Sequence, residues 1–398
     1  MHICFLLPEF HSTSGGGGAE SYVSTMADAL KEQGHRVSII AFGQTNGLDR
    51  RLGLIQLAPP NLHWFLYRGL PFAKSLAIPV REIEWSRRAW SALMDLDHRD
   101  PVDVVETGET IVLQQTTLGR KPPVVIRGHG NPLAIKRYSG KRVGWGDRLG
   151  RNLQLSGIRR AGAITAVSKF QAREIAGDLS LSEDAIHVIS NPISPTLLHQ
   201  ALEEPRVEPA KPVVLYTGRI EFRKGSLELL RSLDRVASRF PDVEYVIAGA
   251  RDNSIDDQML NGALGVNGTR QHVRLLGHVP WQQLADLYRR ASVFVMPSFY
   301  ETFGISVIEA MAFGLPVVAT RTGGLPEVVE DGVTGILVPT GDAEALADAL
   351  IRLLKDPGLR QRMGQAGQER VRDEFTVDHV IDRTLAVYES VAFQNRER

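Results

Sequence analysis

Cysteine is almost absent from this sequence, which has a single one, Cys4, among its 398 residues. A lone cysteine cannot form a disulfide within the chain, and this suits a reducing compartment. Long apolar runs are also missing, since none approaches the roughly 18 residues that indicate a membrane-spanning helix. The opening stretch, MHICFLLP, lacks the basic region of a signal peptide. We therefore expect a cytoplasmic protein.

Net charge is absent as well, because 46 Lys and Arg balance 46 Asp and Glu. This balance argues against general nucleic-acid binding, which needs positive charge on the binding surface. The glycine spacing of nicotinamide-binding enzymes, G-x-G-x-x-G, is not met by the run Gly15 to Gly18. Glu20 or Ser21 stands where the third glycine would be, which disfavours a nicotinamide-dependent oxidoreductase.

What the sequence does contain is a regular alternation of short apolar strands and helical runs, and its length suggests two domains. The predicted strands are 2–8, 36–42, 102–106, 123–128, 163–168 and 186–190, then 213–219, 243–249, 273–277, 293–297, 316–320 and 335–339. This pattern predicts two doubly wound α/β domains with parallel sheets that face a central cleft. In such sheets ligands bind beyond the carboxyl ends of the strands.

A break between the two sets of strands marks the domain boundary. Residues 201–212 are rich in proline and charge, and this composition predicts a linker. It separates an N-terminal domain, 1–200, from a C-terminal domain, 213–375. The last residues, 376–398, predict an amphipathic helix, which we expect to cross back to the N-terminal domain.

Two cations follow the first strand of the second domain, in GRIEFRKG (218–225). Arg219 offers a planar fork of donors and Lys224 a point charge, a combination that suits a diphosphate at the carboxyl end of a strand. The alternative is a pair of solvated surface charges.

The stretch 296–320 places two acids around a predicted helix start. Glu301 lies in the turn after a strand, and Glu309 lies about one turn inside the helix. The first amides of that helix would attract an anion, while carboxylates accept hydrogen bonds from sugar hydroxyls. These amides belong to Phe303, Gly304 and Ile305. The alternatives are an exposed turn residue at 301 and a Ser-x-x-Glu capping box at 306–309.

Two features of the N-terminal half add to this pattern. The glycine run before the first helix lets backbone amides approach an anion, although a glycine run also suits a flexible loop. RGHGNP places His129 in the loop after the fourth strand. Histidine can donate or accept near neutral pH, but a single loop histidine is more often structural.

These motifs together resemble the retaining glycosyltransferases of family 4, which have the GT-B fold. The resemblance rests on GGGGAESYVSTMADALKEQGHRVSII, GRIEFRKG, the ETFGISVIE spacing and AMAFGLPVVATRTGGLPEVVEDGVTGILV. It implies that the C-terminal domain binds a nucleotide-sugar donor and the N-terminal domain the acceptor. The catalytic residues that it implies are His129, Arg219, Lys224 and Glu301, with the two cations on the donor diphosphate.

The donor-binding residues follow from the same resemblance. Glu309 is expected to bind the ribose hydroxyls. The other implied contacts are Gly16, Gly17 and Gly18 near the phosphates, Gly249, Ala250 and Val279 at the base, and the Phe303, Gly304 and Ile305 backbone beside the sugar.

The resemblance also implies a reaction that needs no metal or other cofactor. The cations and the helix start would stabilise the departing diphosphate, and the acceptor hydroxyl would attack from the same face of the sugar. A UDP-hexose is the favoured donor and GDP-mannose the second. The acceptor is expected to be a glycan or a lipid-linked sugar in surface polysaccharide assembly.

Basic residues outnumber acids by eleven to one between residues 120 and 160. They are Arg120, Lys121, Arg127, Lys136, Arg137, Lys141, Arg142, Arg148, Arg151, Arg159 and Arg160. One interpretation is a surface that meets an anionic membrane, which would place the protein at the inner face of the plasma membrane. The alternatives are a solvated face and a patch for a phosphorylated acceptor. The aromatic residues Trp64, Phe65, Tyr67 and Phe72, in an earlier segment of the chain, fit an acceptor groove, a lipid contact or a packed insertion.

Two other functions stay open. A sugar-nucleotide 2-epimerase would share the two-domain cleft but needs acid–base residues that the sequence does not reveal. A non-catalytic paralogue could bind a nucleotide sugar as a sensor.

Overall fold

The computed structural model of the protein describes residues 1–8, 17–43, 47–49, 53–58, 76–109, 121–204, 206–252, 254–264 and 269–396. The chain divides into two compact units. Unit 1 contains Met1–Ala134, Arg142–Ser190 and Val380–Arg398, and unit 2 contains Ile135–Lys141 and Asn191–His379.

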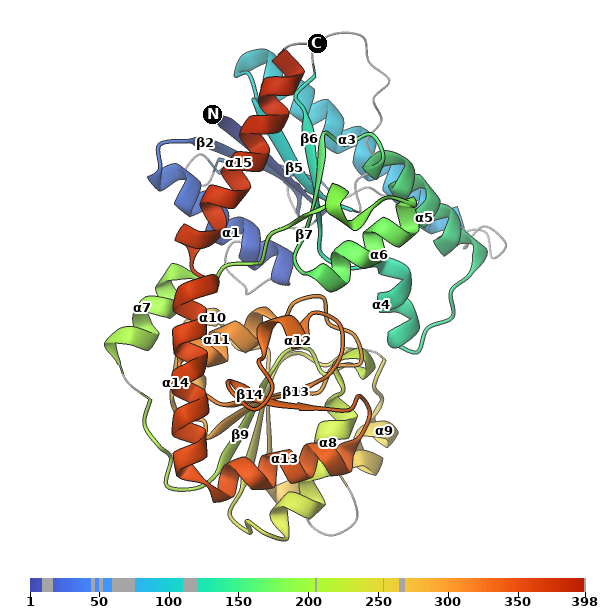
Figure 1. The fold of residues 1–398 in the computed structure, drawn as a ribbon. Helices are drawn as coiled ribbons and strands as arrows, with labels where there is room; N and C mark the ends of the chain where they lie inside the picture. The colour runs from blue at the N-terminus through green and yellow to red at the C-terminus, as the bar shows by residue number, and fades with distance from the viewer. Residues whose placement is uncertain are drawn as a thin grey trace. The chain divides into compact units, whose positions relative to one another are not determined.

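Unit 1 is built on an eight-stranded sheet in the order β3-β4-β2-β1-β5-β6-β7-β8 (Figure 1). Its strands are β1 (His2–Leu7), β2 (Arg36–Phe42), β3 (Gly47–Asp49), β4 (Leu54–Leu57), β5 (Val104–Gly108), β6 (Val124–Gly128), β7 (Ala163–Ala166) and β8 (His187–Val188). Its helices are α1 (Gly18–Glu32), α3 (Ala77–Arg99), the start of α4 (Pro132–Tyr138), α5 (Trp145–Ile158), α6 (Lys169–Leu179) and most of α15 (Val377–Arg396).

Unit 2 is built on a six-stranded sheet in the order β11-β10-β9-β12-β13-β14. Its strands are β9 (Val213–Thr217), β10 (Glu244–Ala248), β11 (Val273–Gly277), β12 (Val293–Met296), β13 (Val317–Thr320) and β14 (Gly335–Val338). Its helices are α7 (Pro195–Glu203), α8 (Ser226–Ala237), α9 (Asp257–Ala263), α10 (Trp281–Arg289), α11 (Ile305–Ala312), α12 (Leu325–Val328), α13 (Ala343–Lys355) and α14 (Pro357–Glu374).

Apolar strands buried on both faces form the cores of the two units. All six residues of β1 and all four of β12 are buried, as parallel strands between helix layers require. In unit 2, α8 packs against α13 and α11 against α14. The predicted doubly wound architecture is therefore confirmed for each unit, and each predicted strand is present to within a few residues. Strands β3 and β4, which pair antiparallel with one another, are not predicted by the sequence pattern.

The expected linker, 201–212, is not a free connection. Its first residues complete α7, and unit 2 already begins at Asn191. Arg206 then donates to the carbonyl of Ala291 at 2.9 Å, and the amide of Val207 donates to that of Arg289 at 3.2 Å. The described part of this charged segment therefore lies on unit 2 and is held there by these hydrogen bonds.

Candidate active site

The predicted cations and carboxylates follow two neighbouring strands in the middle of the unit 2 sheet. Strand order reverses direction at β9, which lies beside β12, and such a switch point is where open α/β sheets bind ligands. Arg219 and Lys224 follow β9, and Glu301 follows β12. The Lys224 ammonium forms an ion pair with the Glu301 carboxylate, so the structure brings these two predicted residues together.

Gly225 explains why the chain can place Lys224 there. Residues Phe222–Lys224 form a short 3-10 turn that ends at Gly225, whose φ of 68° is left-handed. A Cβ at residue 225 would lie 1.8 Å from the carbonyl oxygen of Pro297, so any other residue would push the two loops apart. The rings of Phe222 and Phe299 stack at 5.3 Å and hold the same loops together.

Arg223 is a third cation of this turn, and its role is not predicted by the sequence. It is buried, and its guanidinium donates to the Tyr300 carbonyl at 3.0 Å and to the Glu221 carboxylate at 2.5 Å. Arg223 thus ties the β9 loop to the β12 loop. A buried arginine looks like a solvated one in sequence, so only its position between Arg219 and Lys224 could have indicated this role.

Arg219 differs from Lys224 in its surroundings. Arg219 is exposed, and its carbonyl accepts a hydrogen bond from the Tyr216 hydroxyl at 2.7 Å. The Lys224 side chain is only 17% exposed, so the solvated-pair alternative is wrong for Lys224. The turn and Glu301 together hold three cations and two carboxylates, which leaves a net positive charge at the end of β9.

Glu301 is buried, with 8% of its surface exposed, and the exposed-turn alternative is therefore wrong. Burial on its own would raise the pKa of this carboxyl. The charges of Lys224 and Arg223 and hydrogen bonds from Lys224 and the Phe303 amide outweigh burial and hold the pKa below its usual 4.5. Glu301 is consequently ionised at neutral pH.

Glu309 lies inside α11 and is held by Tyr288. The hydroxyl of Tyr288 donates to the Glu309 carboxylate at 2.7 Å and lies 2.9 Å from the hydroxyl of Thr217. Burial raises the pKa of Glu309, and the hydrogen bond from Tyr288 opposes that rise. The role of Tyr288 is not predicted by the sequence, because no local pattern links this residue to one 21 positions away.

The capping-box alternative for Glu309 is wrong. The N-cap of α11 is Gly304, and no side chain caps the helix there. Ser306 is the second helical residue and cannot serve as the cap. Of the predicted free amides, that of Phe303 bonds to Glu301, and the Phe303 side chain is buried. Ile305 begins the helix.

The residues expected at the nucleotide base lie at the ends of β10 and β11. A Cβ at Gly249 would lie 1.8 Å from the carbonyl oxygen of Gly218, so glycine is required there by the contact between two loops. Ala250 is exposed, and its carbonyl accepts from the Ile220 amide at 2.9 Å. Val279 follows β11 and is partly buried.

In unit 1, the predicted glycines lie at the start of α1. Gly17 is the N-cap and Gly18 the first helical residue, and a Cβ at Gly17 would contact nothing within 4 Å. Gly16 lies outside the described residues, as do Trp64, Phe65, Tyr67 and Phe72.

His129 follows β6, and its ring centroid lies 5.7 Å from that of Tyr22. Burial and the nearby charge of Arg127 lower the pKa of His129 from 6.5 to about 3, so the ring is neutral at physiological pH. Arg127 is fully buried, with its guanidinium 3.9 Å from the centroid of the Tyr22 ring. Arg127 and Arg151 are both core residues, so two of the eleven basic residues do not belong to a surface.

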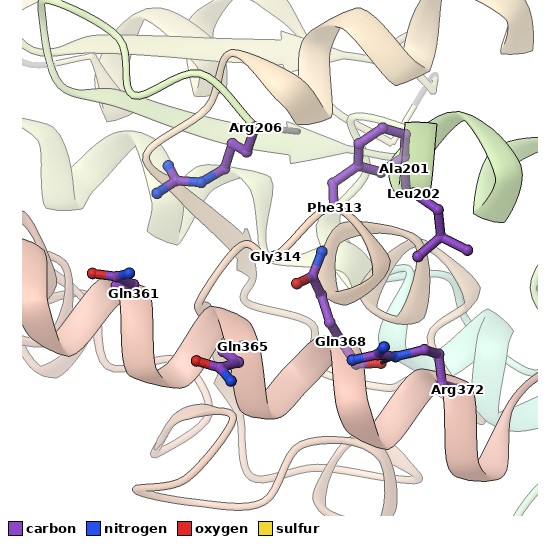
Figure 2. A pocket seen from close by; sticks show the side chains of 9 residues that line it. All are labelled: Ala201, Leu202, Arg206, Phe313, Gly314, Gln361, Gln365, Gln368 and Arg372. Atoms are coloured by element: carbon purple, nitrogen blue, oxygen red, sulfur yellow. Dashed lines mark hydrogen bonds between the residues drawn. The ribbon is translucent and has the colours of Figure 1, made fainter. Parts of the chain in front are cut away.

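A cavity of about 470 Å³ lies elsewhere in unit 2 (Figure 2). Its lining comes from α7, from the residues that follow α7 and α11, and from α14, and includes Arg206, Phe313, Gln361, Gln365 and Arg372. None of the predicted site residues lines it.

Two further observations concern the described residues only. No group of three or more His, Cys, Asp or Glu side chains among them is arranged to hold a metal ion. None of their helices combines the length and apolar character needed to cross a membrane.

Comparison with known proteins identifies the family. Residues 16–197 match the model of Glycosyltransferase Family 4, and residues 200–370 match that of Glycosyl transferases group 1. Alpha-maltose-1-phosphate synthase of Mycolicibacterium smegmatis is 33% identical over 295 residues, which cover 68% of this chain and 73% of that protein.

Solved structures share the fold over nearly the whole chain. Sucrose-phosphate synthase of Thermosynechococcus elongatus has a TM-score of 0.76 at 22% identity and covers 99% of both chains. HepE of Anabaena, in complex with UDP and glucose, has a TM-score of 0.68 at 20% identity, covering 98% of this chain and 100% of that one. The chain therefore belongs to glycosyltransferase family 4, has the GT-B fold and is a glycosyltransferase that uses a nucleotide sugar.

Proposed function

We propose that the protein is a retaining hexosyltransferase that needs no metal and acts in surface polysaccharide assembly, with unit 2 binding the donor. The observation that carries this proposal is the Lys224–Glu301 ion pair beside Arg219 at the β9/β12 switch point. The net positive charge of this turn and Glu301 suits a diphosphate. The buried Glu301 carboxylate suits the hydroxyls of the sugar next to that diphosphate.

The reaction breaks the bond between the anomeric carbon and the diphosphate oxygen and forms a bond from the same face to an acceptor hydroxyl oxygen. The acceptor proton passes to the departing phosphate. Arg219 and Lys224 would stabilise the charge that develops on the leaving group, as a metal ion does in other enzymes. Retention is tested by NMR of the anomeric proton in the first product, and activity is expected to survive EDTA.

Glu309 would bind the ribose hydroxyls, with Tyr288 holding its carboxylate in place. The base would lie against Gly249, Ala250 and Val279, and the sugar beside the Phe303, Gly304 and Ile305 backbone. UDP-hexose is the favoured donor because the similar fold of HepE is known with UDP and glucose. GDP-mannose is the second candidate.

A thermal-shift panel of UDP, GDP and ADP sugars tests the donor. A ligand at 100 times its dissociation constant stabilises the folded protein by about 2.7 kcal/mol. One nucleotide sugar is therefore expected to raise the melting temperature more than the others. A non-catalytic paralogue would show the same shift, and transfer to a glycan acceptor must therefore be measured with the same donor. No shift with any nucleotide sugar would contradict the proposal.

For unit 1 we propose acceptor binding at the carboxyl edge of its sheet. His129 follows β6 at that edge. Gly17 and Gly18, which open α1, and Gly16 before them stay predicted contacts of the donor phosphates. Because its ring is neutral, His129 would act as a hydrogen-bonding group toward a sugar hydroxyl and not as a cation.

The first turns of α5 support contact with an anionic membrane. Trp145 is 55% exposed and Leu149 39% exposed, one helical turn apart, and Arg142 and Arg148 beside them are exposed as well. An aromatic and an aliphatic side chain among cations suit a lipid–water interface. We expect the protein to co-sediment with anionic vesicles and Trp145→Ser to weaken this several-fold, with neutral vesicles as the control. Equal binding to both kinds of vesicle would contradict the membrane proposal.

A further inference from the structure

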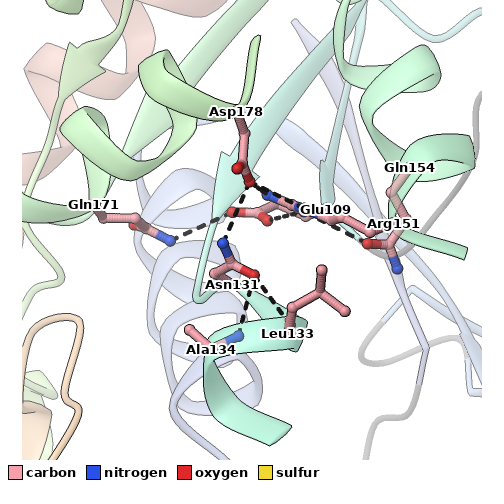
Figure 3. A network of polar contacts seen from close by, with 8 residues as sticks. All are labelled: Glu109, Asn131, Leu133, Ala134, Arg151, Gln154, Gln171 and Asp178. Carbon is pink, nitrogen blue, oxygen red and sulfur yellow. Dashed lines mark hydrogen bonds and ion pairs between the residues drawn. The ribbon is translucent and has the colours of Figure 1, made fainter. Parts of the chain in front are cut away.

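A buried polar network in unit 1 is centred on Arg151 of α5 (Figure 3). Arg151 is 4% exposed, and its guanidinium donates to the Glu109 carboxylate at 2.7 Å and to the Asp178 carboxylate at 2.7 Å. Glu109 follows β5, at the switch point of the unit 1 sheet, and Asp178 lies on α6. Three elements are therefore joined by one side chain. Because both carboxylates already compensate its charge, Arg151 is not arranged to bind an anion.

The network holds the chain immediately after His129. The amide nitrogen of Asn131 donates to Asp178 at 3.3 Å, and the amide oxygen of Asn131 accepts from the backbone of Leu133 at 3.0 Å and of Ala134 at 3.3 Å. Asn131 therefore caps the first turn of α4 while its other end is fixed to α6.

The network also holds the chain immediately before His129. Gln171 lies against Glu109 at 3.5 Å, and its oxygen accepts from the Val167 amide at 2.9 Å. A Cβ at Gly128 would lie 2.7 Å from the Gln171 nitrogen, so the loop packs directly on this side chain. Gly108, next to Glu109, faces the His129 ring, which a Cβ at Gly108 would meet at 3.8 Å.

We propose that Arg151, with Glu109 and Asp178, is a positioning residue that fixes the 128–131 loop and thereby the His129 ring for sugar transfer. The proposal rests on the function proposed above for His129. Arg151 acts through the loop and touches no substrate. The planar guanidinium of Arg151 presents several donors and can bond to both carboxylates at once. The ammonium of a lysine is a single point charge and cannot replace this geometry.

The test uses the full-length protein and two independent measurements. The first is the NMR resonance of the His129 ring in histidine-labelled protein without ligand, assigned by its loss in His129→Gln. The second is steady-state kinetics with UDP-glucose, separating kcat from KM. The variants are Arg151→Lys, Asp178→Asn and Asp178→Leu, and Arg360→Lys is the matched control, since Arg360 is a buried, ion-paired arginine of unit 2.

We expect Arg151→Lys and Asp178→Leu to shift the His129 resonance and to lower kcat about 10- to 100-fold with little change in KM, because a misplaced group loses rate more than affinity. Asp178→Asn keeps an oxygen that Arg151 and Asn131 can reach. Its His129 resonance and its kcat should therefore both stay close to those of the wild-type protein. Arg360→Lys should leave the resonance unchanged.

An unchanged His129 resonance in folded Arg151→Lys and Asp178→Leu would overturn the proposal and leave a purely stabilising network. So would an equal loss of kcat in Asp178→Asn and Asp178→Leu. If the wild-type protein transfers sugar from neither UDP-glucose nor GDP-mannose, the proposed function fails, while the NMR measurement still decides whether the network positions His129.

Discussion

At the scale of single residues, the partner of each charge determines what that charge can do. Lys224 lies beside a buried carboxylate and is positioned by it, whereas Arg219 is exposed and has Asp252 as an electrostatic partner. The neutral His129 and the ionised Glu301 differ for a similar reason. The charge of Arg127 beside His129 disfavours a second positive charge on the ring, whereas two cations face Glu301 and favour its negative charge.

Lys224→Ala is expected to lower kcat by about 10²–10³, the loss typical of one preorganised charge at a transition state. It should also lower the free energy of unfolding by about 3–5 kcal/mol, because Glu301 loses the partner of a buried pair. Kinetics with the identified donor and urea denaturation measure the two effects.

A double variant separates these effects. Lys224→Met with Glu301→Gln removes both charges and should recover much of the stability but none of the turnover. Arg235→Ala is the control, since the Arg235–Asp348 pair of unit 2 is more than half exposed on both sides and should matter little to either measurement. Near-normal turnover in the double variant would show that this pair is not the site of transfer.

At the scale of elements, two loops of unit 2 approach one another closely at Gly225, beside the Phe222–Phe299 stack and the Arg223 hydrogen bond. The β9 loop reaches the β12 loop only because residue 225 has no side chain. The strand order brings these loops to one edge of the sheet, and the tight contact then fixes Lys224 relative to Glu301.

Gly225→Ala is therefore expected to destabilise the protein by more than the roughly 1–2 kcal/mol of a left-handed alanine and to weaken donor binding. Gly332→Ala is the matched control, since Gly332 has a φ of 80° but nothing within 4 Å of an added Cβ. Denaturation curves and donor titrations of both variants are the measurements. Equal losses of stability and of donor affinity in the two variants would show that the close approach of residue 225 to Pro297 has no role.

At the scale of the whole molecule, the C-terminal helix belongs to the unit in which the chain begins. Tyr388 of α15 donates a hydrogen bond to the buried Glu106 of β5 at 2.7 Å, and a Cβ at Gly162 would lie 2.5 Å from Val391. The amphipathic pattern of the helix predicts a packed face, but not that Tyr388 carries a specific polar contact.

Tyr388→Phe is expected to lower the free energy of unfolding of unit 1 by about 1–3 kcal/mol, because a buried carboxylate loses a donor. Phe393→Ala, on the same helix at a site 62% exposed, is the control and should have little effect. The thermal shift that a nucleotide sugar induces in unit 2 should be unchanged in both variants. A loss of that shift in Tyr388→Phe would contradict the assignment of donor binding mainly to unit 2.

The sequence by itself determined the family, the alternation of strands and helices, and the edge of each sheet at which the candidate site residues lie. It could do so because these properties are local. Apolar runs such as residues 293–297 define a strand, and a polar residue that directly follows a strand must lie at its carboxyl end. The predicted Arg219, Lys224, Glu301 and Glu309 follow from that rule and from short motifs.

Only the tertiary structure decided which of these polar groups are buried and what they contact. Arg127, Arg151 and Arg223 look like surface charges in the sequence, yet each is buried. The pairs Tyr288–Glu309 and Arg151–Glu109 join residues 21 and 42 positions apart in the chain. No local pattern encodes such pairs, because the energy of a buried charge depends on partners that the folded chain alone brings within hydrogen-bond distance.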